Sequence, residues 1–93
     1  MTRREEMIKL LREQLMTVTD LSTVFEMSPK EVARDLEHVS KTIRRSGSRF
    51  YQQPARCLSC NYVFKNRKRF TKPHKCPKCR STYVEEAMFK IGD

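Results

Sequence analysis

Two Cys-x-x-Cys pairs near the C-terminus constrain the fold of this chain more than any other feature. The first knuckle (residues 57–60) contains Cys57 and Cys60, the second (residues 76–79) contains Cys76 and Cys79, and fifteen residues, 61 to 75, separate them. A gap of two residues lets both thiolates of a knuckle converge on one ion, and two knuckles complete a tetrahedron of sulfur ligands. The spacing therefore predicts one structural metal ion bound by these four cysteines.

Zinc is the expected metal because four thiolates suit its tetrahedral geometry and leave no open position for catalysis. Iron bound by the same sulfurs, as in rubredoxin, is an alternative, and so are disulfides. His38 and His74 are weaker candidates as ligands, since four cysteines already fill the site. The chain lacks a signal peptide's apolar block and any apolar run long enough to span a membrane. We therefore expect a cytoplasmic protein without membrane contact, in which paired cysteines bind metal in preference to forming disulfides.

The length of 93 residues allows one small domain or two very small lobes that share a core. A core of this size gives marginal stability, and a bound metal is a reasonable supplement. We place a helical lobe at residues 1–49 and a four-cysteine ribbon lobe at 50–93, which could form one integrated domain.

The first 45 residues predict three helices, because a hydroxyl residue precedes a carboxylate by three positions at three places. The predicted helices cover residues 3 to 15 or 16, 18–26 and 29–45, and Pro29 suits the first position of the third. Three residues join the second and third helices, which is typical of a helix-turn-helix; a plain three-helix bundle is the alternative that this spacing leaves open. The side chains expected to face inward at helical spacing are Met7, Ile8, Leu11, Leu15, Leu21, Val24, Phe25, Val32, Leu36, Val39 and Ile43.

Beyond Gly47 the composition favours extended structure. Residues 50–56 are predicted to be extended, with Pro54 excluding a helix there. Residues 62–64 and 81–84 have strand-like composition. Met88, Phe89 and Ile91 indicate a last strand, with a helical turn at 85–88 as the alternative.

Positive charge is concentrated in the C-terminal part of the chain. Residues 1–50 contain ten Lys or Arg and eight Asp or Glu, whereas residues 51–93 contain ten and three. The run between the knuckles predicts phosphate contact, with a solvated loop as the alternative. Phe64 and Phe70 flank this run and are expected to pack on the ribbon core; stacking on a base is the alternative. The cations of the run nominated for phosphate contact are Lys65, Arg67, Lys68, Arg69 and Lys72.

The third helix offers a second basic surface, interrupted by Asp35 and Glu37. A recognition helix presents its N-terminal residues to base edges, so Ser28, Lys30 and Arg34 are expected to be nearest to bases. A solvated helix face is the alternative for each of them. The full predicted surface consists of Ser28 and a stripe at intervals of three or four: Lys30, Arg34, His38, Lys41 and Arg45.

The chain resembles a family of archaeal predicted transcriptional regulators in which a helix-turn-helix is fused to a rubredoxin-like zinc ribbon. The resemblance lies in the segments at residues 17–38, 54–64 and 75–79. It implies an α+β fold, with a three-helix, winged-helix-like helix-turn-helix and a small β zinc ribbon in place of the wing. It also implies that residues 29–45 form the recognition helix. The family pattern tends to have Gly where this chain has Asn61.

We therefore expect a non-enzymatic, DNA-binding transcriptional regulator whose partner is double-stranded DNA. An RNA- or ribosome-associated zinc-ribbon protein and a protein-interaction adaptor of the transcription machinery are the alternatives. The sequence contains no carboxylate pair or nucleophile–base set that would indicate an enzyme. A homodimer through the first helix is compatible with the sequence, although nothing specifies it.

Overall fold

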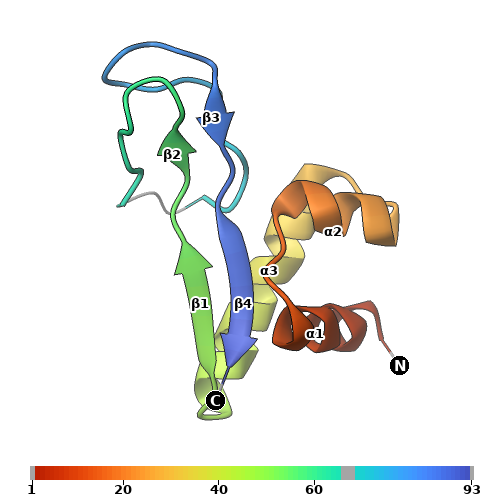
Figure 1. Ribbon diagram of the computed structural model, residues 1–93. Coiled ribbons are helices and arrows are strands. Elements are labelled where there is room, and N and C mark those ends of the chain that lie inside the picture. Colours follow the sequence, from red (N-terminus) through yellow and green to blue (C-terminus); the bar gives the residue numbers. More distant parts are fainter. Residues whose placement is uncertain (1, 66–68, 93) are drawn as a thin grey trace.

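Three helices are followed by two short antiparallel sheets, so the predicted α+β class is confirmed. The structure, a computed structural model, describes residues 2–65 and 69–92. Figure 1 shows the helices on one side of a long, narrow ribbon of strands. The elements in chain order are α1 (Arg3–Glu13), α2 (Val18–Phe25), α3 (Pro29–Arg45), β1 (Arg49–Gln53), β2 (Arg56–Cys57), β3 (Val84–Glu85) and β4 (Met88–Gly92).

Each helix begins at its predicted cap. The Thr2 hydroxyl accepts the Glu5 N–H at 3.2 Å, and the Ser28 hydroxyl accepts the Glu31 N–H at 3.2 Å. At α2 the cap is reciprocal, because Thr17 accepts from the Asp20 N–H at 3.0 Å while its own N–H donates to the Asp20 carboxylate at 3.1 Å. These bonds satisfy N–H groups that have no partner within the helix.

The first helix ends earlier than predicted because the chain after it joins β4. Met16 and Phe89 exchange two backbone hydrogen bonds, at 3.0 and 2.8 Å. Gln14 is already extended, with φ −158°, so the helix ends at Glu13. Leu15 then points outward and is 46% exposed, which makes its predicted inward position wrong.

The second helix also ends one residue earlier than predicted, at Phe25, because Glu26 adopts a left-handed conformation with φ 52°. Val24 is 54% exposed, against the prediction that it faces the core. The third helix has the predicted bounds, and its predicted inward face is confirmed: Val32, Leu36, Val39 and Ile43 are all buried.

The strands form one ribbon in two parts. In the first part β1 pairs with β4, with Phe50 opposite Ile91; in the second, β2 pairs with β3, with Cys57 opposite Val84. Figure 1 shows β1 leading into β2 along one arm and β3 into β4 along the other. The predicted strands at 62–64 and 81–84 shrink to a bridge between Arg56 and Val63 and to the start of β3. The alternative helical turn at 85–88 does not form.

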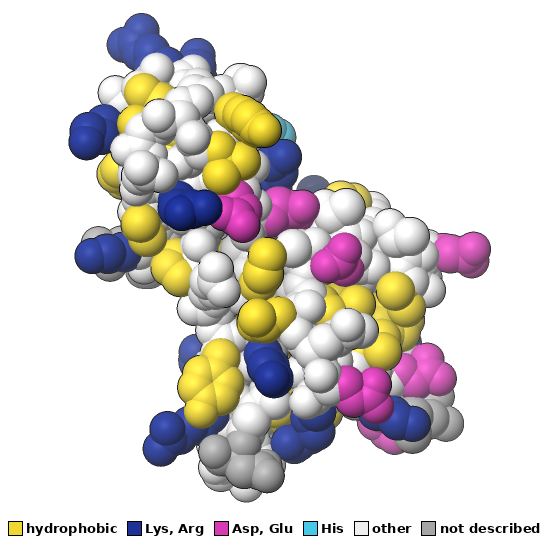
Figure 2. Space-filling view, viewed as in Figure 1, with side chains coloured by type: hydrophobic (Ala, Val, Ile, Leu, Met, Phe, Trp, Pro, Cys, Tyr) yellow, Lys and Arg dark blue, Asp and Glu magenta, His cyan; other side chains and the backbone are white. Residues whose placement is uncertain are grey.

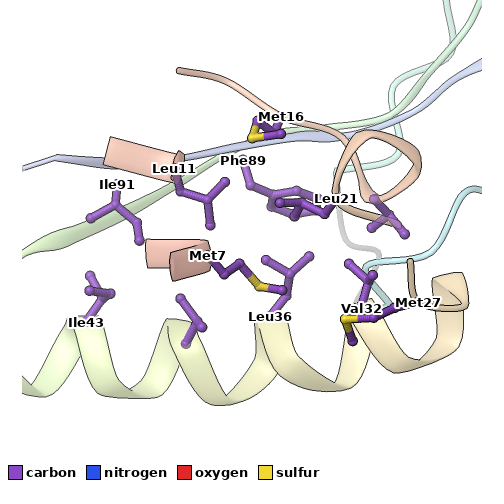
Figure 3. Packing of buried hydrophobic residues seen from close by; sticks show 12 residues of the cluster. Met7, Leu11, Met16, Leu21, Met27, Val32, Leu36, Ile43, Phe89 and Ile91 are labelled. Carbon is purple, nitrogen blue, oxygen red and sulfur yellow. The ribbon is translucent and has the colours of Figure 1, made fainter. Parts of the chain in front are cut away.

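The hydrophobic core joins the helices to the end of the chain. Phe89 and Ile91 on β4 are fully or almost fully buried among Met7, Leu11 and Leu36 of the helices, as Figure 3 shows. Their alternation along the strand places both side chains on the face that covers the helices. The helical part at residues 1–49 therefore shares its core with β4, a strand that follows both cysteine knuckles in the sequence.

Asp35, expected to interrupt the basic surface of the third helix, is instead buried. It is 2% exposed, and its carboxylate accepts hydrogen bonds from Arg3 Nε at 2.8 Å and Arg4 Nε at 3.3 Å. Burial of this carboxylate requires such partners. The result is that α1 is fastened to α3 by charge as well as by apolar packing. None of the helices within the described residues is long and apolar enough to cross a membrane.

Candidate metal centre and basic groove

The two knuckles have the same backbone geometry. Asn61 N–H donates to the Cys57 carbonyl at 2.9 Å, and Arg80 N–H donates to the Cys76 carbonyl at 2.8 Å. Both residues that follow the knuckles are left-handed, with φ 65° at Asn61 and 62° at Arg80. Asn tolerates this conformation well, whereas Arg at the same place is strained. The geometry of the second knuckle thus imposes a left-handed backbone conformation on Arg80 that this residue type disfavours.

The four sulfurs lie where one tetrahedral ion would bring them. All four Sγ atoms are within 4.8 Å of one another, with Cys57 to Cys79 at 3.5 Å and Cys60 to Cys76 at 3.6 Å. A zinc–sulfur bond of about 2.3 Å gives a tetrahedron edge of about 3.8 Å. The cysteines are not joined by disulfides, and the donor set fits zinc.

Hydrogen bonds and contacts among the thiols lower the pKa of two of the cysteines and raise the pKa of the other two. Burial raises the pKa of Cys57, but two backbone N–H groups of its own knuckle and the neighbouring thiols outweigh burial and lower it to about 6. The Ser81 N–H favours the thiolate of Cys79, yet burial and the three other thiols raise its pKa to about 12. The pKa of Cys76 is lowered and that of Cys60 is raised in the same way. A bound cation relieves this crowding by favouring all four thiolates.

Comparison with known proteins decides the family. Residues 2–51 match the family described as PF0610-like, N-terminal, and residues 54–93 match the PF0610 rubredoxin-like zinc beta-ribbon domain. The chain belongs to the PF0610-like family. It is similar to the solution NMR structure of protein PF0610 from Pyrococcus furiosus, with 34% identity, a TM-score of 0.83, and coverage of 98% of this chain and 89% of that one. No curated protein shows significant similarity to it.

Membership of the PF0610-like family, together with the clustered cysteines, confirms the predicted cofactor: the ribbon binds one zinc ion. Cys57, Cys60, Cys76 and Cys79 would hold it, and the ion would supply structural cross-linking, because four thiolates leave no position for substrate. A zinc ribbon of this kind supports a role in binding nucleic acid or protein.

Beside the zinc ribbon lies an open groove, here called the α3 groove, with a volume of about 1460 Å³. One wall is the exposed face of α3 and the other is the ribbon loop (residues 69–74). Figure 2 shows Lys and Arg side chains over the ribbon end and also along the lower edge of the molecule, while Asp and Glu lie between them and over the helical side. The charged residues that line the groove are Lys30, Arg34, Glu37, Lys41, Arg44, Arg69, Lys72 and Glu86, together with His74.

The structure brings together six of the residues predicted for nucleic-acid contact and leaves the others elsewhere. His38, Arg45 and Lys65 are exposed but are not among the described residues that line the groove. Arg67 and Lys68 lie outside the described residues. The six predicted residues that do line the groove are Ser28, Lys30, Arg34, Lys41, Arg69 and Lys72.

Sequence reasoning did not nominate Arg44 or His74 for nucleic-acid contact, and both line the groove. After Arg34 the predicted stripe includes His38 and Arg45, whereas the residues that line the groove at these places are Glu37 and Arg44; Lys41 belongs to both sets. The groove-facing row instead contains Lys30, Glu37 and Arg44 at intervals of seven, which is close to two helical turns. Helical projection alone would not have found this row, because it lies to one side of the face directly opposite the apolar stripe, where Lys41 and Arg45 lie.

Phe70 sets the position of the ribbon loop. Its ring packs against Phe89 at a centroid distance of 5.3 Å and against Phe50 at 6.2 Å, so it joins the helical core instead of the ribbon core predicted for it. Phe64 stays in the ribbon and packs edge-on against Tyr62 at 5.0 Å. With Pro73 buried as well, the anchored loop carries Arg69 and Lys72 opposite α3.

Proposed function

We propose that this protein is a non-enzymatic, DNA-binding regulator of transcription. In this proposal α3 lies in the major groove of duplex DNA, and the ribbon loop contacts the adjacent phosphates. One observation supports it above the others: cations from regions far apart in the sequence line the same groove. Lys30, Arg34, Lys41 and Arg44 come from α3, and Arg69 and Lys72 come from the ribbon loop.

The charge of the groove favours a polyanion as its partner. Six Lys or Arg residues and two Glu residues line this open surface. Such a concentration of like charge repels itself, and phosphates that bind there relieve the repulsion and release counterions. An uncharged ligand would leave the repulsion in place.

The shape of α3 favours duplex DNA over duplex RNA. The helix has 17 residues, which gives a length of about 25 Å. Its outer face is exposed, and Ser28 and Lys30 lie at its N-terminal end. The major groove of B-form DNA, about 12 Å wide, admits a helix, whereas that of A-form RNA is too deep and narrow. The short turn between α2 and α3 also agrees with the way helix-turn-helix proteins present a recognition helix.

The test is duplex binding by the zinc-bound protein, measured by fluorescence anisotropy across a range of salt concentrations. We expect the paired changes Lys30→Ala with Arg34→Ala, and Arg69→Ala with Lys72→Ala, each to weaken binding. Each pair should also reduce the slope of log K against log salt by about one for every phosphate that the variant no longer neutralises. Lys9→Ala is the matched control, because Lys9 is exposed on α1 and does not line the groove.

Competition with structured RNA separates this proposal from its main alternative. If RNA binds more tightly than duplex DNA at every salt concentration, the DNA-binding proposal fails. If the α3 pair leaves duplex affinity unchanged while charge reversal at Arg69 and Lys72 abolishes binding, α3 is scaffold and the ribbon loop alone binds.

A further inference from the structure

Two acidic residues line the otherwise basic α3 groove, and a polyanion would be repelled by both. Glu86 has a structural role, since its carboxylate accepts the Thr19 N–H at 3.3 Å in the first turn of α2. A carboxylate at a helix N-terminus is stabilised by the helix dipole. Glu86 is therefore accounted for by the fold.

Glu37 has no comparable role. Its side chain is 62% exposed, and its carboxylate lies 3.6 Å from the ammonium group of Lys41, one turn along the helix. An exposed pair of this kind contributes little to stability. Glu37 nevertheless lies at the middle of the groove-facing row, seven residues from Lys30 on one side and seven from Arg44 on the other.

The position of Glu37 separates it from the phosphate-binding cations. When a helix enters the major groove, the residues that face the bases squarely, at its N-terminal end and further along the same face, approach base edges, while those at the flanks of that face approach phosphates. A carboxylate in that central position accepts hydrogen bonds and donates none. The base-edge group that suits it is the N4 amino group of cytosine.

We propose that Glu37 determines sequence specificity by accepting a hydrogen bond from a cytosine amino group in the major groove. This inference rests on the proposed function and adds the chemistry of the target: a G·C pair opposite the middle of α3. Glu37 disfavours non-specific duplex binding through repulsion, and the matched cytosine contact offsets that repulsion.

The test is selection from a random-sequence duplex library by the full zinc-bound chain and two variants. We expect the unaltered protein to enrich sites with a cytosine at one position, favoured there by about tenfold. Glu37→Gln should shift that preference to adenine, whose amino group and ring nitrogen match an amide, and should bind unrelated duplexes more tightly. Glu31→Gln removes the same charge from an exposed position of α3 that does not line the groove, and should keep the cytosine.

The possible failures are distinct. If Glu37→Gln selects the same sites as the unaltered protein, or if the protein binds duplex DNA without base preference, the inference about Glu37 is overturned while DNA binding stands. If the unaltered protein enriches no duplex, the proposed function fails and the inference with it. Zinc content and thermal unfolding of each variant, expected to match the unaltered protein, show that the comparison concerns binding.

Discussion

The helical part and the ribbon end of this small protein are held together by different forces. The helical part has a cluster of twelve buried apolar side chains, including Phe89 and Ile91 of β4. Among the described residues of the ribbon end, few apolar side chains other than the cysteines are buried, Ala55 and Val84 among them. The ribbon's organisation depends on two knuckles and four converging thiols. One region is therefore stabilised by removing apolar area from water, and the other by metal coordination.

Removal of zinc should have the largest effect and should separate the two regions. Structural zinc contributes about 10–16 kcal/mol in small zinc peptides at neutral pH. We expect a strong chelator, or Cys60→Ser, to unfold the ribbon end while the helices keep their structure. Amide NMR spectra measure this directly, with ribbon resonances collapsing and helical ones staying dispersed. Dispersed ribbon resonances in the metal-free protein would contradict the conclusion that metal coordination stabilises the ribbon end.

The reverse experiment weakens the helical core. Leu36 is fully buried at the centre of the cluster, so Leu36→Ala should lower the free energy of unfolding by about 2–5 kcal/mol. Leu15→Ala is the control, because the side chain is 46% exposed and its loss should cost well under about 1 kcal/mol. Urea denaturation of the zinc-bound proteins measures both, and equal effects at the two leucines would show that the core is placed wrongly.

Zinc affinity should fall as the pH falls. The pKa of Cys79 is raised to about 12 and that of Cys60 is raised too, so both hold protons at pH 7 in the metal-free protein. Zinc must displace at least these two protons, which makes affinity fall at least about a hundredfold per pH unit near neutrality. Competition with a zinc-binding dye at several pH values measures the slope. A slope near zero would mean that the thiols are already ionised.

The smallest effect concerns backbone strain at the residue that follows the second knuckle. Arg80 has φ 62°, and relieving that strain with Arg80→Asn should stabilise the ribbon by about 1 kcal/mol. Lys78→Asn is the matched control, since it removes one positive charge from the same knuckle at a residue without positive φ. Resistance of each variant to chelation reports the difference. If both variants respond alike, charge explains the effect and strain does not.

The sequence predicted the features that depend on neighbouring residues. Ser28 with Pro29 located the start of α3, and the paired cysteines located the metal centre. Features set by contacts between distant segments were not predictable. Leu15 is exposed because Met16 pairs with Phe89, and Asp35 is buried because Arg3 and Arg4 of another helix reach it.

The α3 groove, too, could be predicted only in part from the sequence. Its cations were visible in the sequence, but their meeting depends on the anchoring of Phe70 against Phe50 and Phe89. The spacing of residues along α3 placed Lys30 and Arg34 correctly. Arg44 was missed and Glu37 undervalued because the ribbon loop covers one side of the helix, away from the face directly opposite the apolar stripe.

The central claim is that the metal-held ribbon and the core-held helix form one binding surface. Titration of the isotope-labelled, zinc-bound protein with duplex DNA, followed by amide NMR, tests it most directly. We expect the amide resonances of Lys30, Glu37 and Lys41 on α3 and of the non-proline residues at 69–74 to shift together, at the same DNA concentration. Shifts confined to one wall of the groove, or centred on the exposed Leu58 and Tyr83 of the ribbon, which do not line the groove, would contradict it.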